Sequence, residues 1–194
     1  DSERSRGLGD VYKRQRGFKG TLYKTDEFLK KHPFGTVPAG FNSDGSEGIF
    51  ESNSIMRAIA RVSSKKSLYG GEDPFIQSRI DSFLDANLVF AREFQVYVLE
   101  INSLKPYLHN RMKSAYLFYL DGIERSLSAN EFIVGNELTI ADVSFVCDLA
   151  QFLRERDNKK IIKEQGFELI TKDFEKDYPK SVSYTHLTLP TNVA

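Results

Sequence analysis

The chain has little of the residues that build metal centres and disulfide frameworks. It has no tryptophan, one cysteine and three histidines among 194 residues. A single cysteine excludes a framework of internal disulfides and suits a reducing compartment, so we expect a cytoplasmic location. Because there is no cluster of cysteine and histidine, we expect no metal site. No apolar run approaches the roughly 20 residues that a membrane helix needs, so we expect no membrane partner.

An excess of charge of either sign is also lacking. Lysine and arginine number 27 and aspartate and glutamate number 27, which gives a formal net charge of +0. A balanced chain has no global field that would attract a polyanion. No basic run carries interleaved aromatic residues, so we expect no nucleic acid as a partner.

Both ends of the chain read as translated sequencing adapter. Residues 5–15, SRGLGDVYKRQ, back-translate into a transposon-end adapter used to prepare sequencing libraries. The reverse complement of the last six codons of this adapter, read from its third base, encodes Val-Ser-Tyr-Thr-His-Leu. This is the sequence of residues 182–187. We therefore expect residues 1–15 and 181–194 to be adapter-derived and not native. The natural part is then residues 16–180, cut at both ends.

Residues 35–60 predict a strand, a tight turn, a second strand and a helix. Val37 and Pro38 are placed in the first strand. A proline fits there only where something other than a neighbouring strand meets the backbone. Glu51 and Ser52 fall where the second strand meets the helix, with Ser52 placed as the helix N-cap. By themselves, the two dipeptides also fit a plain β-hairpin followed by a capped helix.

Helical spacing of apolar residues predicts most of the remaining chain to be helical. A polar, glycine-containing stretch at residues 63–72 predicts a linker between two domains. The expected elements around it are a short helix at 26–31 capped by Thr25, a long helix from Asp73 and Pro74 to about Asn102, and a second long helix over 105–127.

A capping box is predicted at Thr139 and Asp142, which stand three residues apart before an apolar run. The helix that follows, over residues 140–152, is apolar nearly all round and is expected to be buried. Cys147 lies within it, so we expect a buried and inert thiol. Residues 154–160 are predicted to form a charged loop.

Taken together, Val-Pro at 37–38, Glu-Ser at 51–52 and Leu-Thr-Ile-Ala-Asp at 138–142 resemble the cytosolic glutathione transferase family. Residues 25–38 are locally similar to the transferase-like domain of the gamma subunit of translation elongation factor 1B. The resemblance implies a truncated glutathione-transferase fold, mainly α with a small α+β part. Residues 16–62 would form a partial thioredoxin-like, glutathione-binding domain that lacks its first βαβ unit. Residues 73–180 would form an all-helical bundle domain.

The same resemblance implies that Val37, Pro38, Glu51 and Ser52 bind glutathione, as substrate and without a metal. The Val37–Pro38 peptide bond is then expected to be cis. The backbone of Val37 would pair with the cysteinyl unit of glutathione, which is recognition by strand addition. Glu51 and Ser52 would hold the γ-glutamyl end, since a helix N-terminus favours a carboxylate. The thiol-activating residue belongs to the missing first unit, so the catalytic residue is unknown.

Two functions fit these features. In the first, the parent protein is a homodimeric enzyme that conjugates the glutathione thiolate to an electrophilic small molecule. The fragment itself is expected to be inactive, because its activating residue is missing. The alternative is a non-catalytic interaction module of the elongation factor 1B gamma type, which holds partner proteins.

Overall fold

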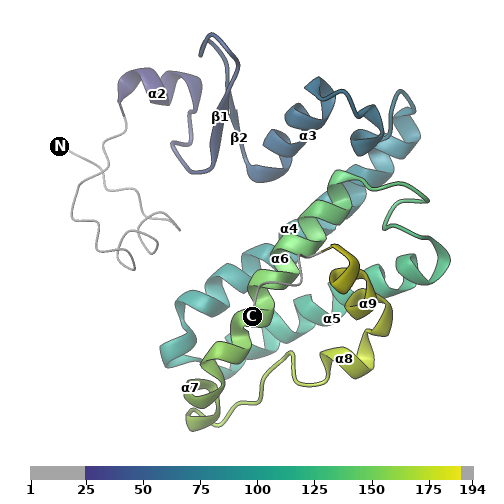
Figure 1. Cartoon of the computed structure of the whole chain (residues 1–194). Helices are drawn as coiled ribbons and strands as arrows, with labels where there is room; N and C mark the ends of the chain where they lie inside the picture. The colour runs from purple at the N-terminus through teal and green to yellow at the C-terminus, as the bar shows by residue number, and fades with distance from the viewer. Residues whose placement is uncertain (1–24, 189–194) are drawn as a thin grey trace. The chain divides into compact units, whose positions relative to one another are not determined.

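The structure is a computed structural model, and it describes residues 25–188 (Figure 1). The chain divides into two compact units, one up to Ser63 and one from Ser64 onward. The segment at 1–15, expected to be adapter-derived, and the beginning of the segment at 16–62 lie outside the described residues.

The first unit contains a two-stranded hairpin between two helices. Its elements are α2 (Asp26–Lys31), β1 (Ala39–Phe41), β2 (Gly48–Phe50) and α3 (Ser52–Val62). The strands are antiparallel, and α3 packs against both of them. Among the described residues they form a sheet of two strands.

Close packing against α2 fixes the position of the hairpin. Thr25 caps α2 as predicted, because its hydroxyl oxygen accepts a hydrogen bond of 3.1 Å from the Phe28 N–H. A Cβ on Gly48 would lie 2.3 Å from the carbonyl oxygen of Lys31, so only glycine lets β2 approach the helix end this closely. The ring of the fully buried His32 stacks on Phe50, with centroids 4.8 Å apart.

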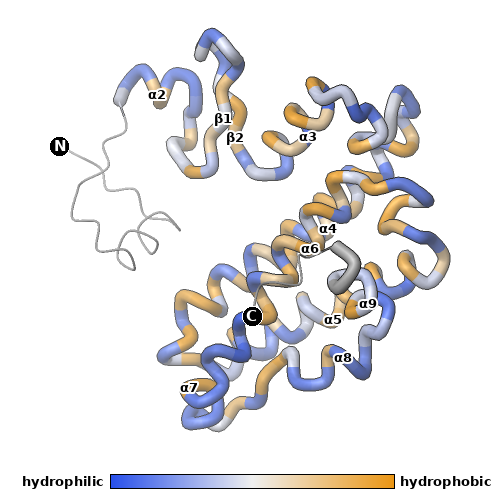
Figure 2. Tube along the Cα trace, in the orientation of Figure 1, coloured by the Kyte–Doolittle hydropathy of each residue, from blue (hydrophilic) through white to orange (hydrophobic). Residues whose placement is uncertain are grey.

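The second unit is a helical bundle built on three long helices. α4 (Pro74–Leu99) packs against both α5 (Pro106–Ala129) and α6 (Ile140–Leu153). Figure 2 shows hydrophobic residues along most of α6, which suits its place in the bundle core. The shorter elements are η1 (Lys66–Tyr69), η2 (Ile101–Ser103), η3 (Arg154–Asn158), α7 (Lys159–Glu164), α8 (Phe174–Asp177) and α9 (Pro179–Thr188).

Aromatic rings fill the centre of this bundle. The fully buried Phe152 meets Phe90 and Phe94 edge to face, with centroids 5.3 and 5.4 Å apart. Phe90 also stacks on Tyr119 at 5.2 Å. Edge-to-face and offset rings are the arrangements that aromatic pairs prefer, so these contacts add to the burial of apolar area.

The predicted helix starts in this unit are confirmed. Asp73 caps α4 by accepting from the N–H groups of Phe75 and Ile76, with Pro74 in the first turn. Thr139 and Asp142 form the capping box at the start of α6. These caps depend on residues two or three positions apart, so local spacing is enough to find them.

Two expectations for this unit are wrong. Residues 154–160 do not form a loop, because η3 covers most of them and α7 begins at Lys159. Cys147 is exposed rather than buried. Val143, one helical turn earlier, is 39% exposed. The two residues share an outer stripe of α6 that no element within residues 25–188 covers, although the stripe is not polar.

Residues 181–188, which we expect to be adapter-derived, continue the helix α9. The carboxylate of Glu124 accepts hydrogen bonds from the N–H groups of Lys180 and Ser181 and from the Ser181 hydroxyl. These contacts place a negative charge at the start of α9, where the helix dipole favours it.

The expected fold class, mainly α with a small α+β part, is confirmed. Within residues 25–188, none of the helices is both long enough and apolar enough to cross a membrane.

Candidate functional site

The hairpin brings the two predicted dipeptides to the same end of the sheet. Ala39 pairs with Phe50 in the antiparallel register. The chain enters β1 from Pro38 and leaves β2 into Glu51, so these two residues are neighbours across the hairpin end. The four predicted glutathione-binding residues, Val37, Pro38, Glu51 and Ser52, therefore lie together although Glu51 comes 13 positions after Pro38.

The Val37–Pro38 peptide bond is cis, as predicted. The placement of the dipeptide inside the first strand is wrong, because β1 begins at Ala39, directly after the proline. A proline cannot donate to a strand ladder, so pairing with β2 starts one residue later. Val37 is 54% exposed, and its backbone lies beyond the paired part of the hairpin.

The helix N-cap at the site is Glu51 and not Ser52 as predicted. The Glu51 carbonyl accepts the first helical hydrogen bond from the Ile55 N–H at 3.0 Å. Glu51 also has a φ of 66°, and among the described residues it is the one non-glycine with positive φ. This backbone turns the chain directly from strand to helix, which puts Ser52 at the first helical position. Such strained residues occur preferentially at binding sites.

The arrangement offers a ligand three kinds of group at one exposed end. The backbone of Val37 lies just before the first paired residue of β1, where it can pair with an extended chain. The start of the 11-residue helix α3 favours a carboxylate, and the exposed Ser52 hydroxyl can donate to it. The exposed carboxylate of Glu51 can accept from an ammonium group. These are the groups that a peptide with a free α-amino acid end requires.

Neither a metal centre nor a reactive thiol is found in the part of the chain that the structure describes. No three His, Cys, Asp or Glu side chains gather as a metal site would need among the described residues. Burial of its sulfur and, second, the charge of Asp148 raise the pKa of Cys147. A raised pKa keeps the thiol protonated at neutral pH, so Cys147 is a poor nucleophile despite its exposure.

Asp148 is a carboxyl whose ionisation opposes folding. Asn87 Nδ2 lies 2.5 Å from both Asp148 Oδ2 and Ser144 Oγ. Burial raises the pKa of Asp148 above 3.8, and the Asn87 hydrogen bond offsets part of that rise. The folded state therefore binds this proton more tightly than the unfolded state, and stability falls as pH rises from 3.8 through the folded pKa.

Asp148→Asn is expected to remove this pH-dependent loss and keep an acceptor for Asn87. The stability of the variant relative to the original chain should rise between acid and neutral pH. Urea denaturation at a series of pH values measures it, and a stability difference that does not change with pH would contradict the assignment.

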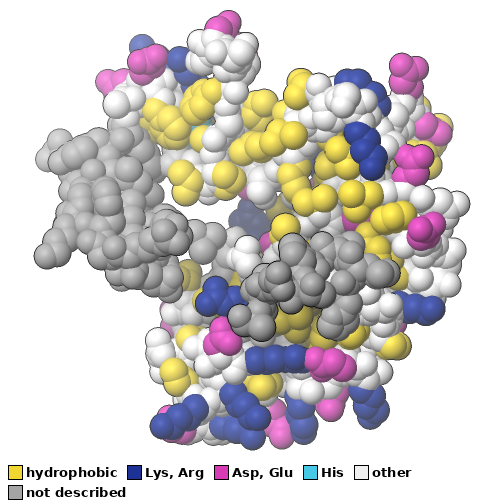
Figure 3. All heavy atoms as spheres, viewed as in Figure 1, with side chains coloured by type: hydrophobic (Ala, Val, Ile, Leu, Met, Phe, Trp, Pro, Cys, Tyr) yellow, Lys and Arg dark blue, Asp and Glu magenta, His cyan; other side chains and the backbone are white. Residues whose placement is uncertain are grey.

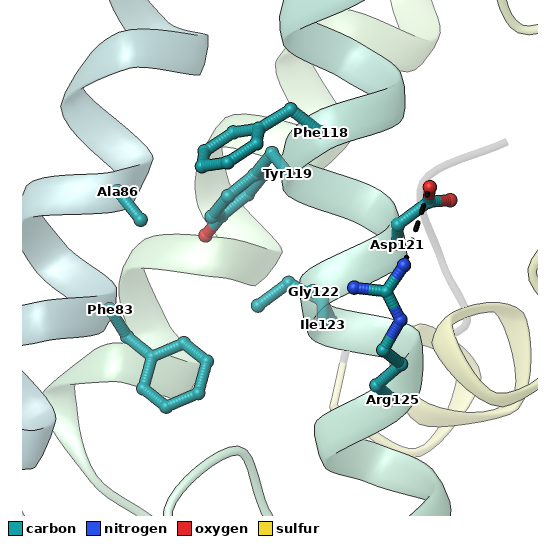
Figure 4. Close-up of a pocket in the computed structure, with 8 residues that line it drawn as sticks. All are labelled: Phe83, Ala86, Phe118, Tyr119, Asp121, Gly122, Ile123 and Arg125. Atoms are coloured by element: carbon teal, nitrogen blue, oxygen red, sulfur yellow. Dashed lines mark ion pairs between the residues drawn. The ribbon is translucent and has the colours of Figure 1, made fainter.

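A pocket of about 210 Å³ lies between α4 and α5 (Figure 4). The rings of Phe83, Phe118 and Tyr119 point into it, and a Cβ on Gly122 would meet nothing within 4 Å. Burial raises the pKa of Tyr119, so it stays protonated. Asp121 and Arg125 also line the pocket, and they pair with each other at 3.9 Å. The spacing of apolar residues in the sequence did not predict this pocket. Spacing shows which residues face the core, but not where packed helices leave a cavity between them.

Comparison with solved structures identifies the fold. A glutathione transferase from Phanerochaete chrysosporium, crystallised with oxidized glutathione, matches with a TM-score of 0.66 and 23% identity over 87% of this chain and 73% of that chain. A glutathione S-transferase-like protein from Lodderomyces elongisporus matches with a TM-score of 0.65 and 21% identity over 84% of this chain and 72% of that one.

Comparison with curated sequences adds a second relationship. A probable elongation factor 1-gamma of Arabidopsis thaliana is 30% identical over 135 residues, which are 67% of this chain and 32% of that protein. Elongation factor 1-gamma 1 of Oryza sativa is 29% identical over 175 residues, which are 85% of this chain and 37% of that protein. The chain thus spans about a third of the length of these relatives.

No protein-family model matches the chain. The resemblance to the glutathione transferase family and the local similarity to elongation factor 1-gamma are confirmed by these comparisons, and the chain has the glutathione S-transferase fold.

Proposed function

We propose that the exposed end of the β1–β2 hairpin binds glutathione through Val37, Pro38, Glu51 and Ser52. The observation that carries the proposal is the pairing of Ala39 with Phe50, which sets a cis proline beside the helix start at Glu51. The backbone at Val37 would pair with the cysteinyl unit. Ser52 and the N–H groups that begin α3 would bind the γ-glutamyl carboxylate, and Glu51 its ammonium group.

We further propose that the glutathione site belongs to an interaction module of the elongation factor 1-gamma type that acts in the cytoplasm. This choice is supported by the sequence relatives, which reach 32% identity, whereas the two transferase structures described above are 21% and 23% identical. Conjugation of glutathione to an electrophilic small molecule by a homodimeric parent is the second candidate, and the geometry of the glutathione site favours it.

Ser52→Ala is expected to weaken glutathione binding by about 1–3 kcal/mol, the cost of leaving a charged acceptor without one donor. Isothermal titration calorimetry measures this, on this chain and on a version with a complete thioredoxin-like domain. Ser64→Ala is the matched control, because Ser64 is exposed and lies outside the site. Equal affinity of the Ser52 variant and the original chain would remove Ser52 from the site.

A conjugation assay separates the two candidate functions. The assay uses the version with a complete thioredoxin-like domain, since this chain is expected to be inactive under either function. In that version, an interaction module should bind glutathione yet not accelerate its reaction with a model electrophile above the uncatalysed rate. An accelerated rate that Ser52→Ala lowers would support the enzyme instead. Absence of both binding and conjugation in the version with a complete domain would contradict the glutathione site itself.

A further inference from the structure

The second unit carries a charged groove that the glutathione site does not use. The groove has a volume of about 430 Å³ and runs between α7 with the end of η3 on one side and residues 168–175 on the other. Figure 3 shows Lys and Arg side chains, with fewer Asp and Glu among them, along the lower edge of the view, and α7 lies at the lower left in Figure 1. The lining has four cationic and two anionic side chains and no aromatic ring.

Ion pairs within the groove occupy both of its carboxylates. Arg156 binds Glu175 through two hydrogen bonds, of 2.6 and 3.0 Å, and also donates to the Thr171 carbonyl. Lys172 pairs with Glu168 at 3.1 Å. The anionic side chains of the lining are therefore already partnered, and the guanidinium of Arg156 is held in place.

Two lysines of the lining take part in neither of these ion pairs. Lys159 and Lys163 are exposed and stand one helical turn apart on α7. Within the described part of the chain, no carboxylate forms an ion pair with either of them. Like charges four residues apart destabilise a helix, so this pair costs stability unless an anion lies between them.

We propose that this groove binds an acidic segment of a partner protein, whose carboxylates lie against Lys159 and Lys163. Leu169 supplies an apolar contact in the lining for a neighbouring side chain of that segment. A peptide suits the groove better than RNA does. The lining has no aromatic ring on which a base could stack, whereas carboxylates need only the two lysine ammonium groups. The inference does not depend on glutathione binding.

The test uses the full 194-residue chain and a fluorescein-labelled octaglutamate peptide, with binding followed by fluorescence anisotropy at low salt. Replacing Lys159→Glu together with Lys163→Glu is expected to weaken binding at least about tenfold. Lys159→Gln with Lys163→Gln should give a smaller loss. The matched control is Lys113→Glu with Lys176→Glu, which changes the net charge equally at exposed positions outside the groove. It should leave the affinity within about twofold.

Added salt should weaken the binding, because exposed charges are screened. Three results would overturn the proposal: no binding at low salt, an equal loss in the control pair, or tighter binding of a labelled oligouridylate of the same charge. Calorimetry of glutathione binding on the same variants distinguishes the two sites. Replacing these lysines should leave the affinity for glutathione unchanged.

Discussion

Replacing Glu155 by alanine is expected to lower the free energy of unfolding by about 4 kcal/mol. Glu155 is 2% exposed, and its carboxylate accepts four hydrogen bonds. They come from the Tyr97 hydroxyl at 2.8 Å, the Ile170 N–H at 3.0 Å, and the Thr171 N–H and hydroxyl at 2.9 and 2.8 Å. The carboxylate thereby joins α4 and η3 to the segment that leads into α8.

Alanine would leave those four donors buried without an acceptor, and each such group costs about 1–3 kcal/mol unless the structure relaxes or water enters. Burial and, second, the charge of Glu155 raise the pKa of Tyr97, so its hydroxyl stays protonated as a donor. Tyr97→Phe removes one donor but leaves three hydrogen bonds to the Glu155 carboxylate. It should therefore lower the free energy of unfolding by only about 1 kcal/mol.

Urea denaturation followed by circular dichroism measures the effect as a lower midpoint at unchanged slope. Asp157→Ala is the matched control, since Asp157 lies on the same 3₁₀ helix but pairs with Arg154 at the surface. Asp157→Ala should change the free energy of unfolding by no more than about 0.5 kcal/mol. A loss below about 1 kcal/mol for Glu155→Ala would mean that the carboxylate is not the joint between these segments.

The sequence predicted well those features that depend on residues a few positions apart. Thr25, Asp73 and the Thr139–Asp142 pair cap their helices as expected, because a cap needs only a side chain and the N–H groups two or three residues later. The meeting of Pro38 with Glu51 also follows from local structure, since a hairpin returns the chain to where it started.

Features set by distant partners could not be predicted. Glu155 lies in a stretch of charged residues that looks like a solvated loop, and donors far from it in sequence, on Tyr97, Ile170 and Thr171, make a buried carboxylate tolerable. Cys147 shows the opposite failure, because an apolar position on α6 stays exposed where no element covers it. At Glu51, the positive φ moves the helix start by one residue, and its side chain gives no sign of this.

Replacing Asp142 by alanine is expected to lower the free energy of unfolding by about 3 kcal/mol. Asp142 is 1% exposed and accepts four hydrogen bonds. Its Oδ2 takes the Thr139 N–H at 2.8 Å and the Thr139 hydroxyl at 2.9 Å, which closes the capping box of α6. Its Oδ1 takes the Ile133 N–H at 2.8 Å and the Tyr184 hydroxyl at 2.7 Å.

This carboxylate therefore caps the central helix and also ties it to the preceding loop and to α9. Asp142→Ala should cost more than losing a cap alone, which is typically about 1 kcal/mol. Tyr184→Phe should cost only about 1 kcal/mol, because the capping box stays closed.

Glu137→Ala, an exposed carboxylate five residues earlier, is the matched control and should change stability by less than about 0.5 kcal/mol. If Asp142→Ala unfolds in urea at the same midpoint as Glu137→Ala, the carboxylate does not hold these three segments together.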